Sequence, residues 1–238
     1  MNTLNKTAKF AAVLYLIITV LAPFSMSYVP SALIVPGDGA ATSSNILTSE
    51  ALFRAGIASD AIVFLTEIAL TAALYALLKP VSKTISLTAA FSRLAMTIIQ
   101  GMNLLPYFFV LLLLSGAGYL KSIAPEQLHA LVMLFLNTHE YVALIWGLFF
   151  GLHLVVLGYL VYKSGYLPGF LGPILVATSL VYLTKGFGTI LFPNYKPILD
   201  SIAFLAFIEI VFPLWLLFKG VREQEPATGH LRPISAVK

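Results

Sequence analysis

The fold is decided by residues 56–78, which read GIASDAIVFLTEIALTAALYALL. A transmembrane helix needs about 20 mostly apolar residues to cross the hydrocarbon core of a bilayer. This run has 23 residues, and it stops at Lys79 and Pro80. Proline disfavours a helical conformation in the residue before it, so the pair gives the run a defined end. The stretch is therefore predicted to be a membrane-spanning helix.

Five further runs of the same kind extend this pattern along the chain. The six predicted spans cover about residues 9–28, 56–78, 86–114, 140–162, 169–191 and 198–219. A polar stretch at 30–53 follows the first span. Residues 125–137 begin with Pro and Glu, as a helix N-terminus prefers, but their apolar run is too short to cross. That segment either lies in the membrane interface or extends the fourth helix.

The composition agrees with a membrane protein. Hydrophobic residues make up 59% of the chain and charged residues 10%, whereas soluble domains average about 45–50% and about 25%. Because so few charged residues cannot form the polar surface of a soluble protein, the lipid bilayer is the predicted partner. The predicted fold is all-α: one polytopic bundle of about six spans over residues 1–219, followed by a polar cytoplasmic tail at 220–238.

The basic residues predict orientation, because cytoplasmic loops carry an excess of Lys and Arg. With the N-terminus inside, nine basic residues fall on the inner side and four on the outer side, while Arg93 lies within a span. Both termini are therefore expected in the cytoplasm. The net charge of +4 forms no basic cluster, so no nucleic-acid partner is predicted. An alternative for the first span, a signal peptide, lacks a clear cleavage site.

Four segments resemble a known family: FRAGIASDAIVFL (53–65), ALYALLKPVSK (73–83), AAFSRL (89–94) and LFFGLHLVVLGYLVYKSGYLPGFLG (148–172). They resemble the bacterial membrane proteins catalogued as domain of unknown function 4386. The last segment carries its expected marks in order: Gly151, His153, Gly158, Tyr162, Ser164, Gly165, Leu167, Pro168 and Gly172. The other marks are Arg54 with Asp60, and Arg93. The resemblance implies a multi-pass protein of the bacterial cytoplasmic membrane and implies no activity.

Ionisable residues inside the predicted spans are candidate functional residues, because each costs about 2.5–3.5 kcal/mol to insert. A helical rise of 1.5 Å per residue places one set roughly 11–16 Å from the inner surface. A second set lies roughly 24–28 Å from it by the same rise. The intramembrane polar layer contains Glu67, Arg93, His153 and Glu209, and the outer polar layer contains Asp60, Gln100, Asn103 and Lys185.

Two interpretations of these layers stay open. In the first, they form a polar cavity or proton relay that holds an ion or a small polar ligand, as in a transporter. In the second, Arg93 neutralises Glu67 or Glu209 and His153 bonds across helices, so the charges only hold together a sensory, accessory or structural protein. A third function, an enzyme acting on a lipidic substrate, has no recognised motif to support it.

The sequence predicts no catalytic residue, metal site or cofactor. The chain has no cysteine, no GxSxG and no HExxH, which removes the usual signatures of thiol, serine and zinc chemistry. His139 and His153 lie fourteen residues apart, as haem ligands can, but no histidine in another span could supply the second axial ligand. The ligand therefore stays unknown.

Small residues predict where helices pack closely. Gly147, Gly151 and Gly158 form a stripe on the fourth span that permits close helix approach. Packing within the bundle is favoured over dimerisation, and a homo-oligomer stays open. Pro106 is expected to kink the third span beside Asn103, where a polar pocket could open.

Topology gives the first testable prediction. Six spans and the nine-to-four basic distribution place both ends inside, so a C-terminal reporter fusion should read cytoplasmic. Fusions at successive loops should alternate between outside and inside, starting with outside after the first span. Their positions are Gly39, Lys83, Ala124, Gly165, Tyr195 and Lys238. A periplasmic signal from the last fusion would contradict the six-span topology.

Overall fold

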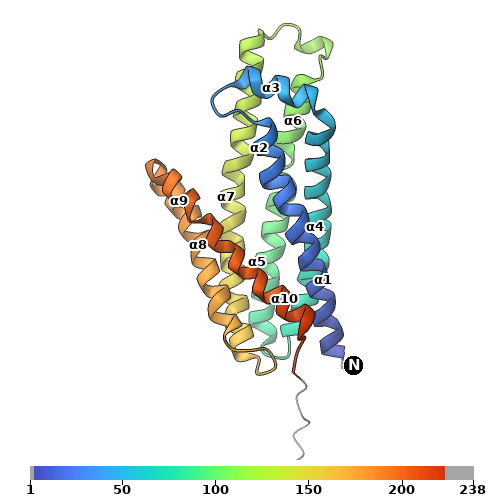
Figure 1. Ribbon diagram of the computed structural model, residues 1–238, viewed down its shortest axis with the longest axis vertical. Helices are drawn as coiled ribbons and strands as arrows, with labels where there is room; N and C mark the ends of the chain where they lie inside the picture. The colour runs from blue at the N-terminus through green and yellow to red at the C-terminus, as the bar shows by residue number, and fades with distance from the viewer. Residues whose placement is uncertain (1–2, 223–238) are drawn as a thin grey trace, which may run out of the picture.

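The computed structural model describes residues 3–222, and this part of the chain is helical throughout, with turns and no strand. Six helical stretches are long and apolar enough to cross a membrane. The prediction of an all-α bundle with six spans is thus confirmed (Figure 1). The stretches are Thr3–Leu33, Glu50–Leu78, Lys83–Leu114, Pro125–Lys163, Leu171–Leu191 and Pro193–Phe218. The predicted tail from residue 223 onward lies outside the described residues.

The first span is a helix interrupted by a wider turn. It consists of α1 (Thr3–Pro23), the π-helix η1 (Phe24–Tyr28) and α2 (Val29–Leu33). π-Helical turns are rare and often occur at functional sites. The interruption follows directly after Pro23, and Pro30 sits in the first turn of α2, where proline is tolerated.

The polar stretch after the first span contains a helix that the sequence did not predict. Asp38 caps α3 (Gly39–Thr48) by accepting a hydrogen bond of 2.8 Å from the backbone N–H of Ala41. Helix α3 lies across one end of the bundle, opposite the N-terminus, and this end is called the α3 end below (Figure 1). A Cβ at Gly39 would lie 2.8 Å from the carbonyl oxygen of His129, so α3 packs directly on a neighbouring backbone.

The next two spans form an antiparallel pair, α4 (Glu50–Leu78) and α5 (Lys83–Met102). The third predicted span is broken rather than merely kinked, because α6 (Leu105–Leu114) follows after a turn at 103–104. Pro106 explains the break: it has no N–H, and its ring would clash with the carbonyl of Met102, four residues earlier. Helix α5 therefore ends at Met102.

The fourth span is much longer than a bilayer requires. Helix α7 (Pro125–Lys163) has 39 residues, or about 58 Å at the α-helical rise. Residues 125–137 therefore extend the fourth helix, the second of the two predicted alternatives, and a short 3₁₀ turn, η2 (Gly118–Leu120), precedes them. The extension packs beside α3 and α6 at the α3 end (Figure 1).

Glycines allow α7 to approach α8 (Leu171–Leu191) closely. A Cβ at Gly158 would lie 2.7 Å from the carbonyl oxygen of Gly172, and one at Gly151 would lie 2.8 Å from the Leu183 side chain. Real Cβ atoms do not come so close to a backbone oxygen, so Gly158 requires glycine, whereas a Cβ at Gly151 would require the Leu183 side chain to shift. At Gly147 the nearest atom belongs to Tyr182, 3.7 Å away, which is an ordinary contact. All three glycines thus face α8 of the same chain.

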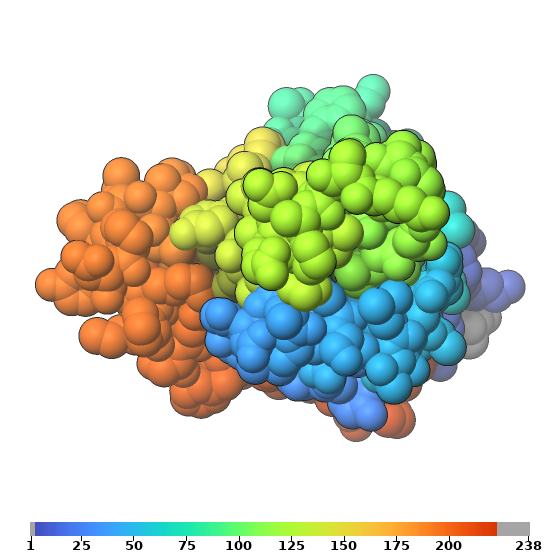
Figure 2. All heavy atoms as spheres, turned by 90° about the horizontal axis from the view of Figure 1, so that it is seen from above, coloured from blue at the N-terminus to red at the C-terminus, as the bar shows by residue number. Residues whose placement is uncertain are grey.

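The sixth span is irregular where the sequence predicted one helix over 198–219. It consists of η3 (Pro193–Tyr195), α9 (Lys196–Ser201), the 3₁₀-helix η4 (Ala203–Ile210) and α10 (Val211–Phe218). Helix α10 packs against α1, whereas α8 and α9 diverge from the other helices toward the α3 end (Figure 1). Figure 2, seen from that end, shows the α8–α9 region standing to one side of the bundle.

The apolar core is divided into two clusters. One gathers α1, α4, α5, α7, α8 and α10 at the N-terminal end, and the other lies toward the α3 end. Along α4, α5 and α7, the residues between these clusters include Asp60, Gln100 and His139. Polar side chains therefore occupy the middle of the bundle, with apolar packing on both sides of them.

One tyrosine closes the N-terminal end. Tyr166, in the loop between α7 and α8, donates a hydrogen bond of 2.7 Å to the carbonyl of Leu77, and its own carbonyl accepts one of 2.9 Å from Arg222. Burial raises the pKa of the Tyr166 hydroxyl to about 12, so it stays a donor at neutral pH. The loop is thereby fixed to the end of α4 and to the chain that leaves α10.

Candidate functional site

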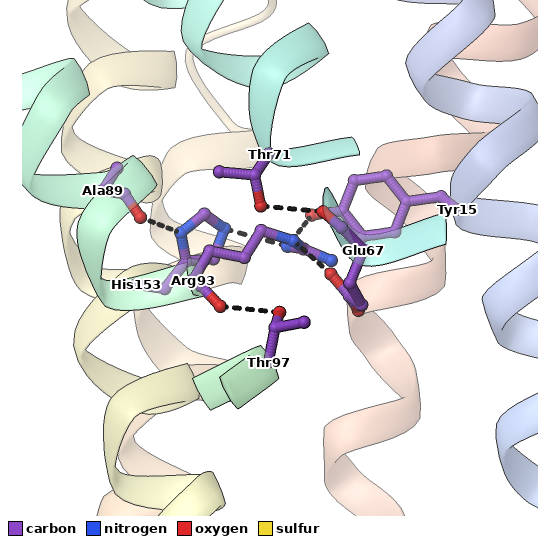
Figure 3. A network of polar contacts seen from close by, with 7 residues as sticks. All are labelled: Tyr15, Glu67, Thr71, Ala89, Arg93, Thr97 and His153. Carbon is purple, nitrogen blue, oxygen red and sulfur yellow. Dashed lines mark hydrogen bonds and ion pairs between the residues drawn. The ribbon is translucent and has the colours of Figure 1, made fainter. Parts of the chain in front are cut away.

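A buried ion pair forms the centre of the bundle. The Arg93 side chain of α5 is 1% exposed, and its Nε lies 2.6 Å from Oε2 of Glu67 on α4 (Figure 3). An Arg–carboxylate hydrogen bond of this length is charge-assisted and roughly twice as strong as a neutral one. Of the two partners that the sequence left open for Arg93, the structure pairs it with Glu67.

Two further helices contribute to the same guanidinium. Nη1 of Arg93 donates to the hydroxyl of Tyr15 on α1 and to Nε2 of His153 on α7, each at 3.0 Å. Its Cζ also lies 4.8 Å from the centre of the Tyr15 ring and 5.8 Å from that of Phe150, within range of cation–π attraction. Arg93 therefore joins α1, α4, α5 and α7 at one point (Figure 3).

These contacts define the tautomer of His153. Its Nδ1 lies 2.8 Å from the carbonyl oxygen of Ala89, which can only accept, so Nδ1 carries the proton. Its Nε2 faces Arg93, which can only donate, so Nε2 offers its lone pair. His153 is thus a neutral acceptor that positions Arg93. It is not a free acid or base in this conformation.

A second carboxylate lies near the same guanidinium without bonding to it. Glu209 of η4 lies close enough to Arg93 and Glu67 to interact electrostatically with both. Its Oε2 is buried and has no hydrogen-bond partner. The central charge cluster, defined as Tyr15, Glu67, Arg93, His153 and Glu209, therefore contains two carboxylates and one guanidinium.

The space beside the central charge cluster is small. A cavity of about 10 Å³ is lined by Arg93 and His153 together with hydroxyl-bearing and apolar side chains of α4, α5 and α7. A single water needs at least about 10–15 Å³ by the same measure. The cavity therefore holds at most one water, and the central charge cluster is closed to a larger ligand in this conformation.

A second polar group lies nearer the α3 end, where α5 breaks. The Asn103 amide donates to the carbonyl of His139 at 2.9 Å, and Nδ1–H of His139 donates to the carbonyl of Asn103 at 2.8 Å. The His139 ring stacks on Tyr107 with 3.9 Å between ring centres. The Asn103 carbonyl at the break is thus bonded to His139 of α7. This contact fills the place where a pocket beside Asn103 was expected.

Three buried polar atoms of this second group lack hydrogen-bond partners. They are Oδ2 of Asp60, Nε2 of Gln100 and Oδ1 of Asn103, on side chains that are at most 3% exposed. Unpartnered buried polar atoms are rare in folded proteins, and each needs an explanation. The other oxygen of Asp60 accepts from the hydroxyl of Ser25 in the π-helix η1.

The structure does not bring Lys185 into this group. Lys185 pairs with Asp200 at 2.9 Å, and Lys196 pairs with Asp200 and with Glu140 at 2.6 Å each, near the diverging ends of α8 and α9. The depth of Lys185 along its helix was estimated from the sequence. Depth alone does not specify the tilt of the helix or the direction of the side chain. Its side chain is 32% exposed, so it is a surface ion-pair residue.

Several residues of both groups were not singled out from the sequence. Tyr15 and Ser25 look like ordinary members of the first span, and Tyr107 looks like part of an apolar run. His139 was noted only for its spacing from His153. The period of seven that links Asp60 to Glu67 and Arg93 to Gln100 places the members of each pair on one helix face, but no such spacing marks Tyr15, Ser25 or Tyr107. Within residues 3–222, no group of three His, Asp or Glu could hold a metal ion.

Six long apolar helices with charged side chains paired in their interior define a multi-pass membrane protein. The chain belongs to the family described as "Domain of unknown function (DUF4386)", which it matches over residues 10–220. It is similar to an "Uncharacterized protein" of Archaeoglobus fulgidus, with 31% identity over 165 residues, 69% of this chain and 83% of that protein. This relative is archaeal, so the likeness does not assign a bacterial source. No solved structure matches the chain.

The pairing of Arg93 gives the second testable prediction. Arg93→Ala should destabilise the purified protein by about 3–5 kcal/mol, because it leaves Glu67 buried without its partner. Lys121→Ala, in an exposed loop, should have little effect. The exchange Arg93→Glu with Glu67→Arg should recover part of the loss, whereas Arg93→Glu with Glu209→Arg should not. Unfolding in detergent measures all of these, and an Arg93→Ala variant that melts like the parent would refute the pairing.

Proposed function

We propose that the protein is a proton- or ion-linked, transporter-like membrane protein, and that the central charge cluster is its switching element. The supporting observation is Glu209, a carboxylate with a buried, unpartnered oxygen beside an arginine already paired with Glu67. In this proposal Glu209 gains and loses a proton or a small cation, and the bundle responds by changing the partner of Arg93.

The charge count supports this role for Glu209. With both carboxylates ionised, the central charge cluster has two negative charges and the single positive charge of Arg93. His153 adds none, because its contacts keep it neutral. An uncompensated charge at this depth in a bilayer is costly. The excess is neutralised most simply by a proton on Glu209 or by a bound cation, and exchange of either one changes the competition for Arg93.

The local backbone supplies a candidate for the moving part. Glu209 lies on η4, an eight-residue 3₁₀-helix, whereas such helices rarely exceed three or four residues. A 3₁₀-helix within a longer span often marks a hinge or strain. Conversion of η4 from a 3₁₀-helix to an α-helix would rotate Glu209 relative to α10, because the two conformations differ in the number of residues per turn. Two discrete arrangements of one element are what a switch requires.

A second candidate, a non-catalytic accessory, sensory or structural role, is favoured by a different observation. Nε and Nη1 of Arg93 both have hydrogen-bond partners, and the adjoining cavity is only about 10 Å³. Under this alternative the charges fix four helices together, and Glu209 keeps one state. The two candidates differ in whether the bundle moves when Glu209 changes its charge.

We also propose that the protein resides in a cytoplasmic membrane with both termini inside. The support is the basic excess on the side that holds the N-terminus and the even number of candidate spans. The lipid bilayer is its main partner in this proposal. The three packing glycines of α7 are occupied by α8 of the same chain, so they are not available as the contact surface of a homo-oligomer.

The switch gives the third testable prediction. The chain has no cysteine, so spin labels at Thr48→Cys and Ser201→Cys, both exposed, report the distance between the α3 end and the sixth span. This distance distribution should differ between about pH 5 and about pH 8, because a proton on Glu209 removes the excess negative charge of the central charge cluster. Glu209→Gln should hold the low-pH distribution at both values, because glutamine mimics the protonated acid.

A matched control is Glu126→Gln, which removes an exposed carboxylate at the start of α7. This variant should keep the pH-dependent change. A Glu209→Gln protein that still responds to pH would refute the assignment to Glu209. No response in the parent protein would favour the accessory role.

A further inference from the structure

Asp60 is a buried carboxylate without a cationic partner. It is 1% exposed in the middle of α4, and none of the ion pairs among residues 3–222 involves it. Its hydrogen-bond partner is the neutral hydroxyl of Ser25, and its second oxygen, Oδ2, has none. A lone carboxylate in a bilayer interior is costly, and such residues commonly mark ion or proton pathways.

Several oxygen atoms surround Asp60, and its own Oδ2 lacks a hydrogen-bond donor. The Ser25 hydroxyl oxygen lies 3.2 Å from the carbonyl oxygens of both Leu21 and Ala22, and it also contacts Oδ1 of Asp60. A hydroxyl has one proton, so it can donate fully to only one of these three acceptors. The Leu21 carbonyl also accepts from Ser59, whereas the second carboxylate oxygen of Asp60 has no donor, so a positive centre beside Oδ2 would complete its contacts.

The backbone at this point is irregular, because the α-helix that holds Leu21 and Ala22 changes to a π-helix after Pro23. Ser25 belongs to η1, the π-helical interruption of the first span, and Ser59 of α4 donates to the carbonyl of Leu21 at 3.1 Å. Carbonyl oxygens at interrupted helices coordinate Na⁺ in secondary transporters. Hydroxyl, carbonyl and carboxylate oxygens are hard ligands that suit hard cations.

We propose that Asp60, Ser25 and the carbonyl groups of Leu21 and Ala22 form a binding site for a small monovalent cation of the Na⁺ type. The single carboxylate balances one positive charge, so a bound Na⁺ leaves the site neutral. A divalent ion would leave an excess charge in an apolar surrounding, and such ions usually bind two or more carboxylates. The site lies on α1, η1 and α4, apart from Glu209 on η4.

Sodium-dependent stability tests this site, and it is the fourth testable prediction. The purified protein in detergent is unfolded by heat in NaCl or in choline chloride of equal concentration. A ligand that binds only the folded state at about a hundred times its Kd should raise the Tm by about 5–11 °C in a chain of this size. Equilibrium binding of ²²Na⁺ to the parent protein should saturate near one ion per chain and be displaced by unlabelled Na⁺ but not by choline.

Three variants assign the effect. Asp60→Asn should lose the sodium-dependent shift in Tm, and Ser25→Ala should keep it with an affinity at least about tenfold lower, because one ligand oxygen is gone. Glu50→Gln, an exposed carboxylate at the start of the same helix, should keep the full shift. Equal Tm values in sodium and choline for the parent protein, with no ²²Na⁺ bound, would overturn the proposal and leave Asp60 as a protonated acid. A sodium shift that survives Asp60→Asn would overturn it as well.

Discussion

The need to pair one buried guanidinium is the constraint on which this bundle depends. Arg93 is 1% exposed on a helix whose length and composition fit a bilayer, and lipid offers its charge no partner. Glu67, Tyr15 and His153 supply the charge and acceptors from three other helices. These polar contacts therefore fix the positions of α1, α4, α5 and α7 relative to one another at one level, in addition to the van der Waals packing that associates helices in lipid.

The ion pair also sets the register of the antiparallel pair α4 and α5. If Glu67 lies opposite Arg93, then seven residues farther along each helix Asp60 and Gln100 come to the same level. A Cβ added at Gly101 would lie 3.9 Å from the Phe64 ring, which agrees with this register. The two polar groups are thus consequences of one alignment. In the first, Arg93, Glu67, Tyr15 and His153 bond to one another and one oxygen of Glu209 is unpartnered, whereas the second retains unpartnered atoms at Asp60, Gln100 and Asn103.

The sequence was sufficient for features that depend on composition along a single helix. Six apolar runs predicted the six candidate spans, and helical rise predicted that Glu67, Arg93 and His153 share a level. It was not sufficient where the direction of a helix matters: the choice of Glu67 over Glu209 and the departure of Lys185 depend on how α8 and η4 lean. Helix α3 was missed because its residues are polar, although Asp38 is a recognisable cap. The irregular η1 and η4 leave no clear mark in a run of apolar residues.

The most direct measurement of the role of Arg93 is the tautomer of His153, read from ¹⁵N NMR of histidine-labelled protein in lipid. Arg93 donates to Nε2 and Ala89 accepts from Nδ1–H, so the spectrum should show a protonated Nδ1 and an unprotonated Nε2. The chain has four histidines, and a His153→Gln sample assigns the signal. A proton on Nε2, in either the neutral or the charged ring, would show that Arg93 does not donate there and would contradict the account of the central charge cluster.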